Sequence, residues 1–418
     1  MKKIIKFFKK RTWLFVLLAC LVFIPQSFSY QAKLNMRVLV SGLAIDKTEN
    51  GYEVTAQVIM PSAGSEAGGL GARLDFISEE GLSVADGIRR IVFKIGKTAA
   101  LSHMGFVIVG ESMLQDNLAT ALDFFARDAQ INPSVMLLVC EGEAKETMKK
   151  TKDLELSVGV GLQKVFIYKQ SSLNGIVMPM EEFIDNAFSF SQSSLVSGIE
   201  IEKENEQESS SESQNTNSLG EESSNSSSGS QEEKQARIKF YNDVYYFKNG
   251  EYVNKLNNEN EILGAYLADK TATNGEFVVK NVTGDALENA TISVQFTNKK
   301  SKKKIDFKNN KMILNLEIDI KDVQVIGILN STKPSINIFD AQNQEIIKLI
   351  KDAIKQEVET CVLAAFNKAK KDNVDIFDIG ERAYQTKTKE WKKFYDKNGE
   401  NYLKNTEIKI DVKIKNVN

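Results

Sequence analysis

An apolar stripe near the C-terminus constrains the fold more than any other feature of this sequence. Across residues 340–371, apolar side chains recur at steps of three and four, so they share one side of an α-helix, while lysines and glutamates fill the other. At about 1.5 Å per residue such a helix is roughly 45 Å long, and it needs a surface to pack on because an isolated amphipathic helix is marginally stable. Residues 407–414 alternate as in a strand with one buried face, and residues 310–328 can supply further strands. We therefore expect a long C-terminal amphipathic helix packed on a sheet.

The N-terminal part of the chain alternates strand-like and helix-like segments. Strands are predicted at residues 36–45, 52–60, 104–109 and 135–140, and the last two are all-apolar runs typical of burial on both faces. Helices are predicted from the capping residue Ser83 to Gly96 and across residues 117–129. This alternation is typical of an α/β layer whose sheet is covered by helices. We therefore expect a mixed α/β (α+β) fold with several domains.

Length and composition also predict several units. The 418 residues exceed one ordinary domain, and a hydrophobic fraction of 42% is enough for packed cores. Residues 203–236 are rich in Glu, Ser, Asn and Gln and lack aromatic residues, so we expect a disordered acidic, serine-rich insertion. The expected divisions are a signal or anchor segment (1–29), one or more N-terminal α/β domains (30–202), this insertion (203–236), a middle segment (237–270) and a C-terminal domain (271–418).

The first 29 residues carry a targeting signal. A lysine-rich start precedes the apolar run 13–24, which is shorter than the roughly 18 residues that a membrane span needs. Three outcomes are open: cleavage after Ser29, lipid attachment at Cys20 in a lipobox-like Leu17-Leu-Ala-Cys20, or retention of the whole segment as an anchor. In all three the remaining chain is an ectodomain outside the cytoplasm.

The reactive side chains form no catalytic or metal-binding pattern. The chain has one histidine, His103, beside an apolar run, so a multi-histidine metal site is excluded and a structural role is expected. Three cysteines exclude a disulfide scaffold, and Cys140 and Cys361 lie in apolar runs that favour core positions. A net charge of −2 argues against a general nucleic-acid binder. We expect no catalytic residue, no metal and no cofactor.

Three polar features allow both a structural and a functional interpretation. Asp375 and Asp378, close to Gly380, could act as an acid–base pair of a hydrolase, but aspartate is common at turns, so turn and cap roles are expected. The basic run 299–304 predicts a solvated hairpin tip, with contact to anionic headgroups or wall polymers as the alternative. The pair Arg127-Asp128 is expected to be structural, with partner binding as the alternative.

Four sets of residues, in this order, together resemble one family, the Ger(x)C or GerAC-like C subunits of nutrient germinant receptors. The sets are 40–46 with 51–61; 106–111 with 122–128; 247–256 with Glu261 and Gly264; and 375–380 with Trp391. The resemblance covers most of the mature chain. It implies an extracytoplasmic lipoprotein of several α/β domains, without catalytic residues, that works with integral membrane A- and B-type subunits. It also aligns Cys20 with the lipidated cysteine of the family, although Ala19 stands where glycine is usual.

The resemblance implies a non-enzymatic, membrane-attached subunit of a nutrient germinant receptor, acting in spore germination. It would lie on the extracytoplasmic side of the cell membrane or the spore inner membrane. The alternative is a stand-alone extracytoplasmic binding or envelope-assembly lipoprotein in a non-spore context, for which a cleft between domains is expected. Nucleic acid is a partner in neither case.

Overall fold

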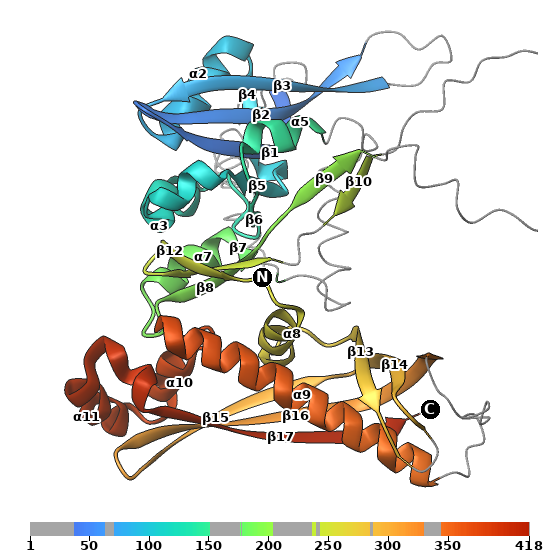
Figure 1. Cartoon of the computed structure of the whole chain (residues 1–418). Helices are drawn as coiled ribbons and strands as arrows, with labels where there is room; N and C mark the ends of the chain where they lie inside the picture. Colours follow the sequence, from blue (N-terminus) through green and yellow to red (C-terminus); the bar gives the residue numbers. More distant parts are fainter. Residues whose placement is uncertain are drawn as a thin grey trace, which may run out of the picture.

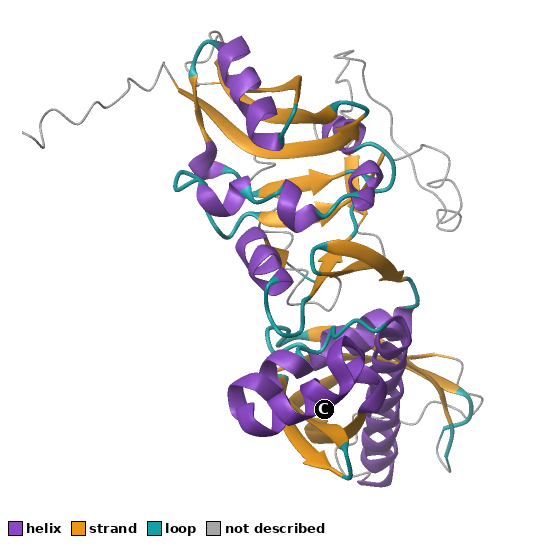
Figure 2. Cartoon of the chain, turned by 90° about the vertical axis from the view of Figure 1, so that its left-hand side faces the viewer, coloured by secondary structure: helices purple, strands orange, loops and turns teal. Residues whose placement is uncertain are grey.

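The computed structural model describes residues 37–62, 71–150, 176, 178–203, 236–239, 243–284, 287–329 and 344–417. A seven-stranded sheet with its helices forms an N-terminal lobe, a five-stranded sheet with its helices forms a C-terminal lobe, and a three-stranded sheet lies between them (Figures 1 and 2). The expected mixed fold with several sheets and covering helices is confirmed, whereas the domain boundaries stay predictions. The signal segment 1–29, with Cys20, lies outside the described residues.

The N-terminal sheet combines an antiparallel meander with a parallel half. Its strands are β1 (Arg37–Thr48), β2 (Gly51–Ser62), β3 (Gly71–Gly81), β4 (Thr98–Ala100), β5 (Phe106–Val109), β6 (Met136–Val139) and β7 (Met178–Pro179). Strands β5 and β6 are buried at every position, as their all-apolar sequences predict. The helix α2 (Val84–Ile95) packs on β2 and β3, and α5 (Ala144–Lys150) contacts β1.

The caps of α2 lie where the sequence places them. Ser83 accepts a hydrogen bond from the backbone N–H of Asp86, and Gly96 ends the helix in the left-handed conformation. The helix predicted across residues 117–129 is wrong as one element. The structure has two single turns instead, α3 (Leu118–Ala121) and α4 (Phe124–Arg127), because the chain leaves helical geometry at Leu122.

The middle sheet is shared by two hydrophobic cores. It has the order β12 (Glu251–Leu256), β11 (Val244–Lys248), β8 (Ser193–Ser197). Along β11, Tyr245 and Phe247 pack into the core of the N-terminal lobe, while Val244 and Tyr246 pack into the core of the C-terminal lobe. Because side chains alternate between the faces of a strand, one strand, buried from Val244 to Phe247, joins both cores.

Further elements flank the middle sheet. They are α7 (Met180–Ala187), α8 (Glu259–Ala268) and the paired strands β9 (Glu200–Lys203) and β10 (Ala236–Lys239). The predicted insertion 203–236 touches these two strands only at its ends. Its remaining residues lie outside the described part of the chain.

The C-terminal lobe is built around one long strand. The sheet comprises β13 (Gly275–Val282), β14 (Ala290–Thr297), β15 (Lys300–Lys308), β16 (Lys311–Leu329) and β17 (Thr406–Val417). Strand β16 pairs with β15 and β14 along one side and with β17, in parallel, along the other. The helix α9 (Gln344–Asp372) lies along this sheet, and its apolar stripe from Ile346 to Ala369 is buried, which confirms the long packed helix (Figure 1). The short helices α10 (Ile379–Thr386) and α11 (Thr388–Asn398) close the lobe.

The basic run 299–304 is not the solvated hairpin tip that was predicted. Most of it belongs to β15, and Lys299 is only 1% exposed. The ammonium group of Lys299 donates to the carbonyl oxygens of Leu267 (2.8 Å) and Asp269 (2.6 Å), at the C-terminal end of α8. The last carbonyl groups of a helix have no partners within it, and a cation there is favourable. A run of lysines cannot reveal that one of them lies beside a helix end distant in sequence.

Candidate functional site

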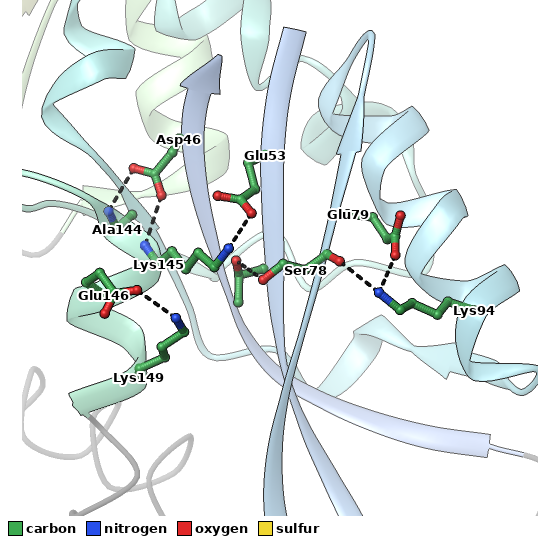
Figure 3. A network of polar contacts seen from close by, with 10 residues as sticks. Asp46, Glu53, Ser78, Glu79, Lys94, Ala144, Lys145, Glu146 and Lys149 are labelled. Atoms are coloured by element: carbon green, nitrogen blue, oxygen red, sulfur yellow. Dashed lines mark hydrogen bonds and ion pairs between the residues drawn. The ribbon is translucent and has the colours of Figure 1, made fainter.

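The residues that carry the family resemblance gather where elements and lobes meet. In the N-terminal lobe, the carboxylate of Asp46 accepts hydrogen bonds from the backbone N–H groups of Ala144 (2.8 Å) and Lys145 (2.9 Å), at the start of α5 (Figure 3). A Cβ atom on Gly110 would lie 2.0 Å from Asp46 Oδ1, so only glycine fits there. Burial raises the pKa of Asp46, and the two N–H groups oppose that shift. Asp46 therefore fastens α5 to the ends of two strands.

The turn between β11 and β12 ties the middle sheet to the N-terminal lobe. The side-chain amide of Asn117 donates to the carbonyl oxygen of Asn249 (2.7 Å), and the N–H of Leu118 donates to that of Gly250 (2.8 Å). These contacts cap α3 with a loop more than a hundred residues away in sequence. The turn Asn249-Gly250 therefore connects β11 with β12 and also attaches the middle sheet to the N-terminal lobe.

The opposite side of the middle sheet is tied to α9. The hydroxyl of Tyr246 and the side-chain amide of Asn254 both donate to Asp372 Oδ2, the latter at 3.0 Å. Lys368 lies 3.6 Å from the same carboxylate, and these partners together lower the pKa of Asp372 against the effect of its burial. A second contact brings α8 onto α9, where a Cβ atom on Gly264 would lie 1.9 Å from the carbonyl oxygen of Cys361.

The segment that follows α9 forms the most buried polar joint. Asp375 is 3% exposed, and its Oδ2 accepts from the N–H of Gly380 (2.7 Å) and the hydroxyl of Tyr402 (2.8 Å). Burial, followed by the charge of Asp375, raises the pKa of Tyr402 well above its ordinary value, so the hydroxyl stays protonated and donates. The carbonyl oxygen of Asp375 accepts from the hydroxyl of Ser193, in β8.

The loop before β8 completes this joint. The N–H of Glu381 donates to the hydroxyl of Ser191 (3.0 Å), and the N–H of Phe190 donates to the carboxylate of Glu381 (3.0 Å). The ring of Phe190 lies 4.0 Å from that of Tyr384 and 6.2 Å from that of Trp391, measured between centroids. Residues 190–193 and 375–381 therefore hold the two lobes together.

A cavity of about 680 Å³ opens beside this joint. Its walls come from four separate segments, and its apolar part is formed by Ile176, Met178, Leu195 and Ile376. The volume falls within the range of small-molecule sites. Sequence reasoning missed this cavity because no local pattern brings α7, the end of α8, β15 and the start of α10 together.

The polar lining of the cavity includes both carboxyl groups and cationic side chains. The pKa of Asp378 is raised to about 6, first by desolvation, while Lys303 at 3.9 Å opposes the shift. The side chain of Asp378 is 58% exposed, so it borders an open space rather than a closed core. Burial and the neighbouring Asp269 raise the pKa of Glu182. The cavity thus combines two carboxyl groups of raised pKa with several cationic residues, which are Lys270, Lys302, Lys303, Lys304 and Arg382.

The two aspartates considered as an acid–base pair do different things. Asp375 accepts hydrogen bonds inside the joint, and Asp378 occupies the N-cap position of α10 in a left-handed conformation, without a side-chain cap bond. Arg127 pairs with Asp123 on the helix surface, and the carboxylate of Asp128 accepts from the N–H of Gln130 (2.8 Å). His103 is exposed, in a 3-10 turn before β5. The bonds of Asp375, Arg127 and Asp128 are all made to groups within the protein.

Three further findings hold for the described residues. Cys140 and Cys361 are buried free thiols, and burial raises the pKa of each to about 12. Within the described ranges, no group of three or more His, Cys, Asp and Glu side chains is placed to hold a metal ion. In that same part of the chain, the helices are too short or too polar to cross a bilayer.

Comparisons with known proteins agree with this architecture. The family model for the spore germination protein N-terminal domain matches residues 30–201, and that for the spore germination B3/GerAC-like C-terminal domain matches residues 242–417. Spore germination protein KC of Bacillus subtilis is 20% identical over 388 residues, which cover 90% of this chain and 87% of the relative. The putative spore germination protein YfkR of the same organism is 27% identical over 131 residues, or 30% of this chain and 34% of the relative.

A solved structure supports the fold. The crystal structure of the GerBC protein superposes with a TM-score of 0.51 at 16% sequence identity, covering 90% of this chain and 96% of that chain. The family models together span most of the chain, and the resemblance seen in its sequence is confirmed. The chain therefore belongs to the GerAC family of spore germination proteins.

Proposed function

We propose that this chain is a non-enzymatic, membrane-attached subunit of a nutrient germinant receptor complex. It would act in spore germination by assembling with integral membrane A- and B-type subunits, on the extracytoplasmic side of the cell membrane or the spore inner membrane. Membership of a spore germination family supports the process. The hydrogen bonds that its motif carboxylates accept within the protein support an assembly role rather than a catalytic one.

One observation carries the proposal: polar groups in and next to the family motifs make contacts inside the protein, some within a lobe and some between the middle sheet and the C-terminal lobe. Asp46, Asp372 and Asp375 each accept hydrogen bonds within the protein. A buried carboxylate that already holds donors is suited to fixing geometry, and it is a poor proton carrier. A rigid, multi-lobed ectodomain is what an assembly subunit needs.

The attachment is proposed to reside in residues 1–29, with Cys20 as the candidate for lipidation. Mass spectrometry of the mature N-terminus separates the three routes. A diacylglyceryl group on Cys20, a free Tyr30 or an intact Met1 would identify lipidation, cleavage or a retained anchor respectively. A diacylglyceryl group carries two acyl chains, which supply the two signals that stable anchoring takes, and contacts with integral partners would add to it.

The experiment that tests the assembly role combines deletion with co-purification. Spores that lack the gene are expected to lose one nutrient-triggered germination response, and the wild-type gene should restore it. The tagged chain, solubilised from spore membranes in mild detergent, should co-purify with integral membrane subunits. Normal germination on every nutrient, together with no co-purifying membrane protein, would contradict the proposal.

A second candidate function is supported by the cavity between the lobes. A stand-alone binding lipoprotein would use its roughly 680 Å³ to hold a small molecule. A ligand present at about a hundredfold its Kd stabilises the folded state by about 2.7 kcal/mol, which a thermal-shift screen detects. A specific shift that Asp378→Asn removes, in a chain without membrane partners, would favour this function over assembly.

A further inference from the structure

The outer face of α2 presents cations around an isolated aromatic ring. Phe93 is 89% exposed, the highest exposure among the large apolar residues of the described chain. The side chains of Arg89, Arg90 and Lys94 are 81%, 55% and 57% exposed. Lys97 follows the helix and is exposed as well. We call Arg89, Arg90, Phe93, Lys94 and Lys97 the α2 outer face.

The spacing of these residues makes them one surface. Arg89 and Phe93 are four residues apart, as are Arg90 and Lys94, so the two pairs lie side by side along the helix. The opposite side of α2 is buried against the sheet through Val84, Gly87, Ile88 and Ile91. The α2 outer face is therefore turned away from the protein core, and its residues are free to meet another body.

This surface lies at the end of the sheet where β1 begins. Strand β4 follows α2 directly and pairs in parallel with the first residues of β1, with Thr98 opposite Arg37. The C-terminal end of α2 and the start of β1 are therefore neighbours. Helix α2 itself lies at the side of the N-terminal lobe opposite the C-terminal lobe (Figure 1). Leu39, at the same end, is a second apolar residue with substantial exposure, at 40%.

The proposed anchor reaches this end of the molecule. Eight residue steps separate Ser29 from Arg37. A fully extended chain spans at most about 3.6 Å per residue, so the start of β1 would lie within roughly 29 Å of a retained anchor that ends at Ser29, and within roughly 61 Å of a lipid on Cys20. The inference rests on the proposed membrane attachment, which supplies the tether.

The charge of the surface suits an anionic bilayer. Asp86 pairs with Arg89 and Arg90, and Glu79 pairs with Lys94, while Lys97 has no ion pair within the described ranges. Four cations and these two carboxylates leave an excess of two positive charges. Basic side chains close to a membrane are attracted by its anionic lipids.

The apolar content also favours lipid over a protein partner. Protein interfaces bury a contiguous, well-packed core of apolar side chains. The α2 outer face offers one ring and four cations, and helices at the headgroup level of a membrane likewise combine Lys and Arg with large apolar residues such as Phe. We propose that the α2 outer face rests on the anionic surface of the membrane to which the chain is attached, with Phe93 inserted among the headgroups. This contact orients the ectodomain and directs the C-terminal lobe away from the bilayer.

A depth measurement on the full-length chain tests this proposal. Phe93→Cys, labelled with a nitroxide and reconstituted in vesicles of phosphatidylglycerol and phosphatidylcholine, should become accessible to oxygen and protected from a water-soluble nickel reagent. The matched control is Phe188→Cys, another exposed phenylalanine (82%), at the end of α7 beside the middle sheet. Its label should remain accessible to the nickel reagent. The unsubstituted chain, labelled in parallel, corrects for any reaction at Cys20.

The electrostatic part is tested by charge and salt. Replacing Lys94 and Lys97 by glutamine should reduce the fraction of chains whose α2 outer face contacts the vesicle surface, by about fivefold for each charge removed. Raising the salt to about 1 M, where the Debye length is about 3 Å, should give a similar loss.

Each outcome decides the question. Nickel accessibility at position 93 in a chain that still floats with the vesicles would overturn the orientation while sparing the attachment. Failure of the chain to float would overturn both. Protection that appears only when integral partners are present would assign the α2 outer face to a protein and refute the lipid contact.

Discussion

Replacing Asp375 tests the claim that this residue joins the structure and has no part in chemistry. In Asp375→Ala, the N–H of Gly380 and the hydroxyl of Tyr402 lose their acceptor in a site that is closed to solvent. Each buried donor left unpaired costs about 1–3 kcal/mol, so the expected loss of unfolding free energy is about 2–5 kcal/mol. For a lobe of this size, such a loss lowers Tm by about 5–15 °C.

The measurement is denaturant unfolding followed by tryptophan fluorescence. Trp391 is 1% exposed, and its ring lies 5.1 Å from that of Tyr402, so its emission reports on this joint. Tyr402→Phe alone should cost about 1–2 kcal/mol, and it should cost much less once Asp375 is already alanine, because the two share one interaction. Asp378→Asn is the control from the same motif, and it should change the free energy of unfolding by less than about 1 kcal/mol. Equal losses at both aspartates, or an unchanged Asp375→Ala protein, would refute the reasoning.

Three further predictions concern the contact of α8 with α9 at Gly264 and the shifted pKa values of Lys299 and Asp378. Gly264→Ala should lower the free energy of unfolding by about 1–3 kcal/mol in a urea titration, because its Cβ would lie 1.9 Å from the carbonyl oxygen of Cys361. This overlap outweighs the gain in helix propensity of about 1 kcal/mol. Asn260→Ala, at an exposed position of the same helix, is the control. Burial lowers the pKa of Lys299 from 10.5 to about 7, so between these pH values the unfolded state binds one more proton than the folded state. The stability of the wild-type protein relative to Lys299→Met should therefore rise as the pH rises from 7 to 10.5. An equal difference in stability at pH 7 and pH 10.5 would contradict this linkage. Desolvation raises the pKa of Asp378 from 3.8 to about 6, so in that pH interval the folded state binds one more proton than the unfolded state, and stability is lost as the pH rises through it. The loss should be less than about 1 kcal/mol, because the side chain is half exposed, and Asp378→Asn should remove it. Thermal melts of both proteins at pH 4 and pH 7 measure the difference.

The predicted elements that the structure confirms depend on local patterns. The stripe of α9, the alternation of β17 and the caps of α2 are each encoded within a few turns or strand residues. The helix predicted across residues 117–129 failed because the hydrophobic pattern continues through Leu122, where the backbone does not. Periodicity reports which side of a segment is buried and cannot report where a helix is broken by contacts with other segments.

The polar residues show where sequence reasoning stops. The aspartates at 375 and 378 were expected to be turn and cap residues, and the backbone agrees, yet the sequence could not show that the carbonyl of Asp375 accepts from Ser193, 182 positions earlier in the chain. Lysine is expected in water because burying its charge is costly, and Lys299 is an exception because the end of α8 supplies oxygen acceptors. The cavity between the lobes escaped prediction for the same reason.

By itself, the sequence determined most of the segments, the buried sides of the long helix and of the all-apolar strands, and the family. These properties arise from residues close together along the chain, where steric preference and hydrophobic spacing act directly. Only the tertiary structure decided that one strand, β11, serves two cores, that Asp375 bonds to Ser193 of the middle sheet, and that the end of α2 lies beside the start of β1. Such arrangements depend on contacts between distant segments, whose free energies come from burial and pairing that no single segment contains.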